Sequence, residues 1–394
     1  MATSRTGREL AGLATRAVAA RRSAIREVFD LANRLPDAIR LEIGEPSFAT
    51  PRHVVDAAFE AARAGRTGYT PNGGYATLRA ALAEKIARVD GYEIDPDCVV
   101  VTPGAMNALF SIYLALLEPG DEVLLPTPGF PNMDEMVRLL GGEPVFYRLD
   151  AAHGYLPSRD ELEPLITPRT KAIFANTPGN PTGAVFPAET VRGLAELAAE
   201  RGVWLVSDEV YDELVLDDLP HVAAAALVAE GQVVSVYSFS KVYAMTGWRV
   251  GYCAAPPELA DVLRKLQEPE VSCPSAISQH AAEAVLRGPR DEFDLMREAY
   301  RERRDRAVVE AVAHGLSVFR TQGTFYMLVD VAASGLSPRE FTLRALQEHR
   351  VAVAPGEVFG PGGEGLVRIS FGVEPDVLAE GMARIARAVE SFAA

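Results

Sequence analysis

Short apolar runs of strand length alternate with longer helical patterns through the middle of the chain. Continuous apolar runs separated by helices favour parallel strands that are buried on both faces of a sheet. The predicted strands are 98–102, 122–125, 144–149, 171–175, 203–207 and 233–236, and the predicted helices between them include 105–117, 133–140 and 187–201. The sequence therefore predicts an α/β fold whose large domain has a mostly parallel sheet covered by helices on both faces.

The pattern changes from about residue 290. A long charged helix is predicted over 291–315, followed by strands at 325–329 and 366–371 and a final helix at 374–391. Ser337-Pro338-Arg339-Glu340 has the form of a capping box with proline at the first helical position. We expect a smaller C-terminal α/β domain at 291–394, a large domain at 51–290, and an N-terminal segment, 1–50, that belongs to the small domain.

Composition excludes several classes of function. The formal net charge of −15 over 394 residues opposes binding to nucleic acid or to anionic lipid. The longest mainly apolar stretch, 108–117, is about half of what a membrane-spanning helix needs. The three cysteines form no CxxC pair, so we expect neither a zinc site nor a disulfide framework, and a cytoplasmic location.

Common catalytic motifs are missing or misplaced. The sequence 360–365 matches GxGxxG, but it precedes a predicted strand instead of opening a helix, as a dinucleotide site requires. No GxxxxGK[ST], HExxH or GxSxG motif occurs, and the six histidines form no ligand pair. We therefore expect no nicotinamide cofactor and no metal ion.

One lysine stands in an unusual place. Lysine occurs only at Lys85, Lys171, Lys241 and Lys265. Of these, Lys241 follows an apolar run and is preceded by Ser238 and Ser240. Burial lowers the pKa of an amine, and the free amine is the form that condenses with an aldehyde to a Schiff base. Pairing of Lys241 with a carboxylate is an equally good interpretation of this feature alone.

Three further polar turns follow predicted strands, where ligands of open α/β sheets gather. Asp208 follows the run 203–207, and a buried carboxylate needs a cation such as a protonated pyridinium nitrogen. A helix N-cap, or a metal ligand together with neighbouring acids, is the alternative. Asn180 lies in a rigid Pro- and Gly-rich turn, and the turn 102–106 has free N–H groups suited to an anion. Ordinary turns would account for both.

These motifs resemble a known family. SFSK at 238–241, MTGWRVGY at 245–252 and NTPGNPTG at 176–183 match fold-type-I pyridoxal-phosphate (PLP) enzymes of the aspartate-aminotransferase-like group, class I/II. The resemblance extends from 41–46 to 367–370. It implies a PLP-dependent aminotransferase that moves an amino group between an amino acid and a 2-oxo acid.

The resemblance also implies roles for individual residues. Lys241 would form the internal aldimine and shuttle the proton, Asp208 would pair with the pyridinium nitrogen, and Asn180 and Tyr211 would hydrogen-bond the cofactor's 3-oxygen. The implied phosphate ligands are Ser238, Ser240, Arg249 and the turn Gly104, Ala105 and Met106. Phe130 would stack on the pyridine ring, and Arg368, beside Gly44 and Asn180, would bind the substrate α-carboxylate. Tyr69 would reach the partner subunit's phosphate, which implies a homodimer.

One position departs from the pattern. Relatives that process acidic side chains often carry a lysine where this chain has Met106. We therefore expect a neutral or unusual substrate instead of aspartate. A carbon–sulfur lyase, a decarboxylase or an oxidative deaminase on the same scaffold is the main alternative. A PLP-binding regulator of DNA is disfavoured, because residues 1–40 are too few for a winged-helix domain.

Overall fold

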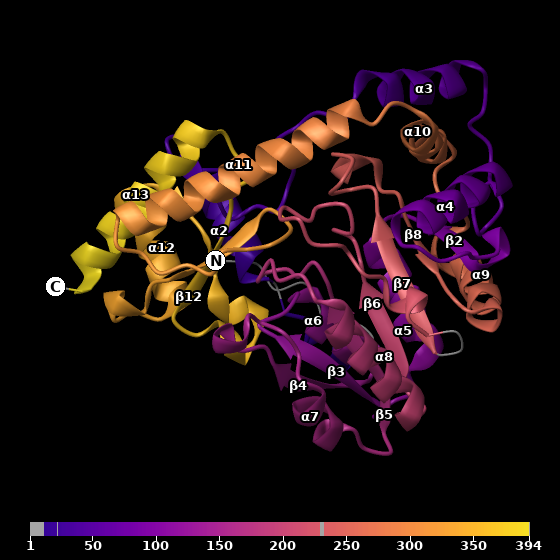
Figure 1. The fold of residues 1–394 in the computed structure, drawn as a ribbon, viewed down its shortest axis with the longest axis horizontal. Coiled ribbons are helices and arrows are strands. Elements are labelled where there is room, and N and C mark those ends of the chain that lie inside the picture. The colour runs from indigo at the N-terminus through magenta and orange to yellow at the C-terminus, as the bar shows by residue number, and fades with distance from the viewer. Residues whose placement is uncertain (1–11, 22, 229–231, 394) are drawn as a thin grey trace, which may run out of the picture.

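The computed structural model describes residues 12–21, 23–228 and 232–393 (Figure 1). Its largest sheet has seven strands in the order β2-β8-β7-β6-β5-β3-β4. The strands are β2 (Val99–Thr102), β3 (Glu122–Thr127), β4 (Glu143–Arg148), β5 (Thr170–Asn176), β6 (Trp204–Asp208), β7 (Val233–Ser238) and β8 (Gly251–Ala254). All strands of this sheet except β8 run in the same direction. The predicted mostly parallel sheet is confirmed.

Strand β8 is the one member of this sheet that the sequence analysis did not predict. It pairs antiparallel with both β7 and β2. Because β8 has only four residues, GYCA, it carries too little pattern to be recognised as a strand. The chain between β7 and β8 carries Lys241 and Arg249, so both residues lie at the edge where β7 ends.

Helices flank the large sheet, as expected (Figure 1). They are α3 (Arg52–Arg63), α4 (Ala76–Val89), α5 (Ala105–Leu116), α6 (Asn132–Leu139), α7 (Arg159–Leu162), α8 (Ala188–Arg201), α9 (Pro257–Val271) and α10 (Ala276–Arg287). Helix α8 ends at Gly202, whose φ of +66° suits glycine at a helix terminus. No helix in the described ranges is long and apolar enough to cross a membrane.

The remaining elements form a second group around two small sheets. Strands β11 (Ala354–Pro355), β12 (Leu366–Ser370) and β9 (Tyr326–Asp330) form an antiparallel sheet, and β1 (Ile39–Arg40) pairs in parallel with β10 (Val351–Ala352). The helices are α1 (Thr15–Val18), α2 (Ala24–Ala32), α11 (Asp291–Ala313), α12 (Pro338–His349) and α13 (Pro375–Ala393). In Figure 1, α11 extends from beside α10 to the region of α12 and α13.

The β1–β10 pair joins the N-terminal segment to the C-terminal part of the chain. Division of the chain at residues 50 and 290 stays a prediction, and residues 1–11 and 22 of the N-terminal segment lie outside the described residues. The predicted capping box is confirmed: Ser337 Oγ accepts the N–H of Glu340 at 3.2 Å, with Pro338 at the first helical position.

Candidate active site

A cavity of about 610 Å³ lies where the parallel strands end. Twelve of the residues singled out from the sequence line it: Gly44, Ala105, Met106, Phe130, Asn180, Asp208, Tyr211, Ser238, Ser240, Lys241, Arg249 and Arg368. Gly104 directly precedes the lining residues of α5. Tyr69 does not line this cavity: its side chain is 93% exposed on the single chain.

Lys241 provides the amine of this cavity. It is half-buried, and its Nζ donates to the carbonyl oxygen of Gly44 at 2.6 Å. The other lysines lie elsewhere: the side chain of Lys85 is 3% exposed in a separate cluster, and those of Lys171 and Lys265 are 45% and 72% exposed. An aldehyde entering the cavity would therefore meet a single primary amine.

Asp208 is a buried carboxylate that forms no ion pair with another residue that the structure describes. It is the last residue of β6, whereas the sequence analysis placed it directly after the strand, because the strand continues one residue beyond the apolar run 203–207. Its Oδ1 accepts the N–H of Val210 at 3.3 Å, and no ion pair reaches it in the part of the chain that the structure describes. Burial raises the pKa of Asp208 to about 7. A positive group bound beside it would restore the ionised form.

Asn180 and Arg368 meet on the opposite side of the cavity. Arg368 donates from Nη1 to Asn180 Oδ1 at 3.1 Å and from Nη2 to the carbonyl of Glu42 at 2.7 Å. Its Nε is buried without a hydrogen-bond partner among the described residues. Burial also lowers the pKa of Arg368. A buried guanidinium with a free donor is suited to an incoming carboxylate.

The first turn of α5 forms the third wall. Its N–H groups have no acceptor within the helix, so they can receive an anion. A Cβ added at Gly104 would lie 2.5 Å from Arg249 Nη2, so only glycine lets the arginine approach this turn. Arg249 is exposed, and its backbone has a left-handed conformation with φ of 52°. Ser238 Oγ accepts the N–H of Ser240 at 3.1 Å. Hydroxyl groups, a guanidinium and helix N–H groups thus converge.

Comparisons with known proteins agree with this geometry. The family described as aminotransferase class I and II matches residues 36–385. The chain belongs to this family. It is an aminotransferase.

Relatives support the assignment over nearly the whole length. The aspartate aminotransferase of Geobacillus stearothermophilus is 37% identical over 365 residues, covering 91% of this chain and 92% of that protein. Aromatic-amino-acid aminotransferase 2 of Thermococcus litoralis is 36% identical over 372 residues, covering 93% and 96%. The structure of Thermus thermophilus aspartate aminotransferase with maleate superposes with a TM-score of 0.93 at 37% identity, covering 96% and 100%.

Enzymes of this family use PLP, and the residues of this aminotransferase fit that group. An aldehyde needs an amine, a pyridinium nitrogen needs a carboxylate, and a phosphate needs several donors. The cavity offers the amine of Lys241, the unpaired carboxylate of Asp208, and the α5 terminus with Arg249. The three features differ in chemistry, and each matches a different part of the cofactor.

Two further residues of the cavity lining, Tyr326 and Asn176, contact predicted site residues but received no role in the sequence analysis. Tyr326 accepts a hydrogen bond from Tyr211 at 3.2 Å, its ring lies 4.2 Å from the Arg368 guanidinium, and a Cβ at Gly44 would collide with its hydroxyl. Asn176 donates to the carbonyl of Asp208 at 2.9 Å and accepts the N–H of Asn180 at 2.7 Å. Asn176 directly follows the predicted strand 171–175 and is the first residue of the turn 176–183, which was a usable signal. Tyr326 carried none.

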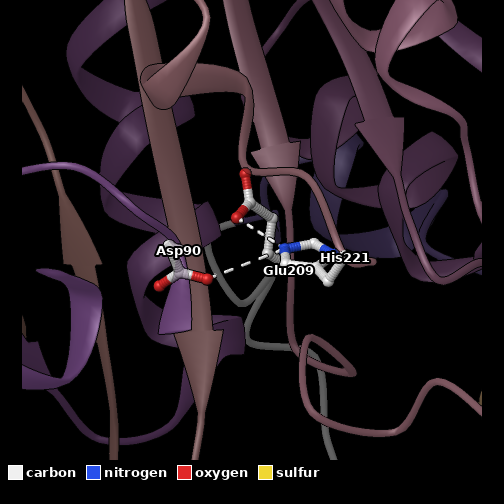
Figure 2. Close-up of side chains that lie close together, drawn as sticks. All are labelled: Asp90, Glu209 and His221. Atoms are coloured by element: carbon white, nitrogen blue, oxygen red, sulfur yellow. Dashed lines mark hydrogen bonds and ion pairs between the residues drawn. The ribbon is translucent and has the colours of Figure 1, made fainter. Parts of the chain in front are cut away.

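A second cluster of charges lies beside the end of β6, where Glu209 follows Asp208. Figure 2 shows His221 between Glu209 and Asp90, with its Nε2 at 3.2 and 3.8 Å from their carboxylate oxygens. Lys85 Nζ lies 3.6 Å from Asp90 and also contacts Asp212. Although the ligand atoms of the trio lie within 4.8 Å of one another, the chain supplies its own cations, so we interpret the cluster as structural. Asp208 is not a member of this trio, so Asp208 and Glu209 do not form one set of metal ligands.

Proposed function

We propose that this aminotransferase binds PLP covalently through Lys241 and transfers an amino group between a neutral amino acid and a 2-oxo acid. The observation that carries the proposal is that one cavity holds both the lysine amine of its lining and a buried carboxylate that forms no ion pair among the described residues. Asn180 and Tyr211 would hold the cofactor's 3-oxygen, and Phe130 its ring face. Ser238, Ser240, Arg249 and the first turn of α5, after Gly104, would hold the phosphate.

The chemistry is divided between the cofactor and the protein. When bound, PLP supplies a ring that withdraws electrons from the substrate Cα. Lys241, once its Nζ is free, is placed to take the Cα proton and return it at the neighbouring carbon. Arg368 would grip the α-carboxylate with two donors, which orients the Cα–H bond toward that amine. Asp208 would hold the ring nitrogen in its protonated form.

Several finer points belong to the same proposal. Met106 in the cavity wall offers no charge to a distal carboxylate, which favours a neutral substrate over aspartate. The exposed Tyr69 would act in the site of a second copy, which makes the enzyme a homodimer. The free cysteines Cys98, Cys253 and Cys273 suit a reducing cytoplasm.

The test is the near-ultraviolet and visible spectrum of the purified enzyme with PLP, before and after addition of single amino acids. We expect a yellow band that a neutral amino acid bleaches, with release of the matching 2-oxo acid, and no such band for Lys241→Ala. Release of ammonia, carbon dioxide or a thiol would instead assign a deaminase, a decarboxylase or a lyase. Absence of any band in the wild-type protein would refute cofactor binding.

A further inference from the structure

A second cavity of about 760 Å³ adjoins the first. Both cavities are lined by Ser23, Met106, Phe130, Pro131 and Asn132. The two cavities therefore share part of their lining, which includes the side chains of Met106 and Phe130. We call this second space the side-chain cavity.

The lining of the side-chain cavity is mainly apolar. Besides the shared residues, its apolar members include Phe110, Leu125, Met133, Met136, Leu139, Phe146, Val358 and Phe359. Met133 and Phe359 are 1% and 2% exposed, so the floor belongs to the core. Methionine side chains are flexible and polarisable, and they adapt to apolar ligands of different shape. An apolar hollow of this size gains most from a large apolar group.

The charges at the rim disfavour an anionic occupant. They comprise two arginines against four carboxylates: Arg21, Arg138, Asp134, Glu135, Glu357 and Glu364. Arg21 already binds Asp134 at 2.7 Å and Glu135 at 3.3 Å, and Arg138 binds Asp134 at 2.7 Å. The arginines are thus committed to acids of the rim. A distal carboxylate on the substrate would meet excess negative charge and no free cation in the described lining.

We propose that the side-chain cavity is the subsite for the substrate's side chain, and that the enzyme prefers amino acids with a long, unbranched apolar side chain. The inference rests on the proposed function, since it takes Arg368 and Lys241 as the ends that fix the reacting carbon. A substrate side chain that leaves the reacting carbon beside Met106 enters the side-chain cavity. The methyl group of alanine leaves this cavity empty, and the carboxylate of aspartate finds no cation in it to compensate its charge.

A homologous series tests the proposal in the holoenzyme. The substrates are alanine, norvaline, norleucine and 2-aminooctanoate, with aspartate for comparison. Burying one methylene is worth about 0.8 kcal/mol, so kcat/KM should rise about fourfold for each added methylene. Values that stay level or fall beyond alanine, or a preference for aspartate, would overturn the subsite. If no amino acid at all bleaches the cofactor band, the proposed function has failed instead.

A variant that fills the side-chain cavity provides a second test of the proposal. Ala24 is the first residue of α2, is half-buried and lines only the side-chain cavity, so Ala24→Trp places an indole in the hollow. The ratio of kcat/KM for 2-aminooctanoate to that for alanine should fall at least tenfold. Ala199→Trp, on the exposed side of α8, should leave the ratio unchanged. The ratio is independent of the folded fraction, so an unchanged ratio in Ala24→Trp would contradict the assignment.

Discussion

Asp208 and Glu209 are consecutive, buried carboxylates, yet they lie in opposite electrostatic environments. Asp208 borders the cavity without an ion pair to another described residue, and burial raises its pKa to about 7. Burial also disfavours the ionised Glu209, but hydrogen bonds from His221 and Ser235 outweigh it, so the pKa of Glu209 is lowered. One peptide step at the end of β6 therefore separates a charge left unmatched from a charge that is matched.

The comparison separates two uses of buried charge. A matched cluster stabilises the fold only as a whole, because removal of one member leaves another uncompensated. An unmatched carboxylate costs stability until a ligand arrives, and such groups gather at functional sites. Variants in the matched cluster and variants at the cavity should therefore lose different properties of the enzyme.

The largest effect is expected from Lys85→Met in the matched cluster. It removes the cation that contacts Asp212 and Asp90, so the free energy of unfolding should fall by about 3–5 kcal/mol. Urea unfolding measures the loss, while kcat per folded molecule should be unchanged. Lys265→Met, which removes an exposed pair with Asp261, should cost less than about 1 kcal/mol. Equal losses in the two variants would argue against the matched cluster.

Replacement of Asp208 should act in the opposite direction on the cofactor-free protein. A raised folded-state pKa means that the protonated form is favoured, so stability falls as the pH rises from about 4 through 7. Between about pH 5 and pH 8 the wild type should lose roughly 2–3 kcal/mol that Asp208→Asn retains. Urea unfolding of both proteins across that range measures the difference. Asp90, whose pKa is also raised to about 7, contributes to both proteins equally. Parallel pH profiles would show that Asp208 is not unmatched.

Arg368→Lys should mainly weaken substrate binding. Lysine cannot reproduce the two-pronged contact, so KM for the amino acid should rise about 100-fold, with a smaller change in kcat. Steady-state kinetics separates the two parameters. Arg303→Lys is the matched control, because Arg303 is equally buried but pairs with Glu374 outside the cavity lining. A fall in kcat alone would contradict a role in carboxylate binding.

The smallest effect is expected from Tyr326→Phe. The ring beneath Arg368 remains, and only the hydroxyl that receives the Tyr211 hydrogen bond is lost. A hydrogen bond of this kind is worth about 1 kcal/mol, or roughly a fivefold change in kcat/KM. Tyr300→Phe, a buried ring outside the cavity lining, should leave kcat/KM unaltered. A loss as large as that of Arg368→Lys would make Tyr326 a substrate ligand in its own right.

The parts of the site that could be predicted from the sequence are those built from residues that are close together in the chain. Strand, turn and polar residue occur together at Asp208, Asn180 and Lys241, so their convergence at one sheet edge could be expected. Contacts between distant segments could not be predicted in the same way. Tyr326 meets Tyr211 across 115 residues, and Ser23 reaches the cavity from the N-terminal segment, because packing between the two groups of elements places them there. Neither the hydrophobic pattern nor the secondary-structure propensities of a sequence indicate which distant segments pack together.

The scarcity of lysine has a practical consequence for handling the protein. Among the lysines, the amines accessible from the surface belong to Lys171 at the start of β5 and Lys265 in α9. Neither residue lines either cavity. Coupling the protein to a solid support through amine-reactive chemistry would therefore tether it at few positions that are remote from the catalytic cavity. Immobilised enzyme should keep most of its turnover, while a reagent small enough to enter the cavity would have one further amine to modify.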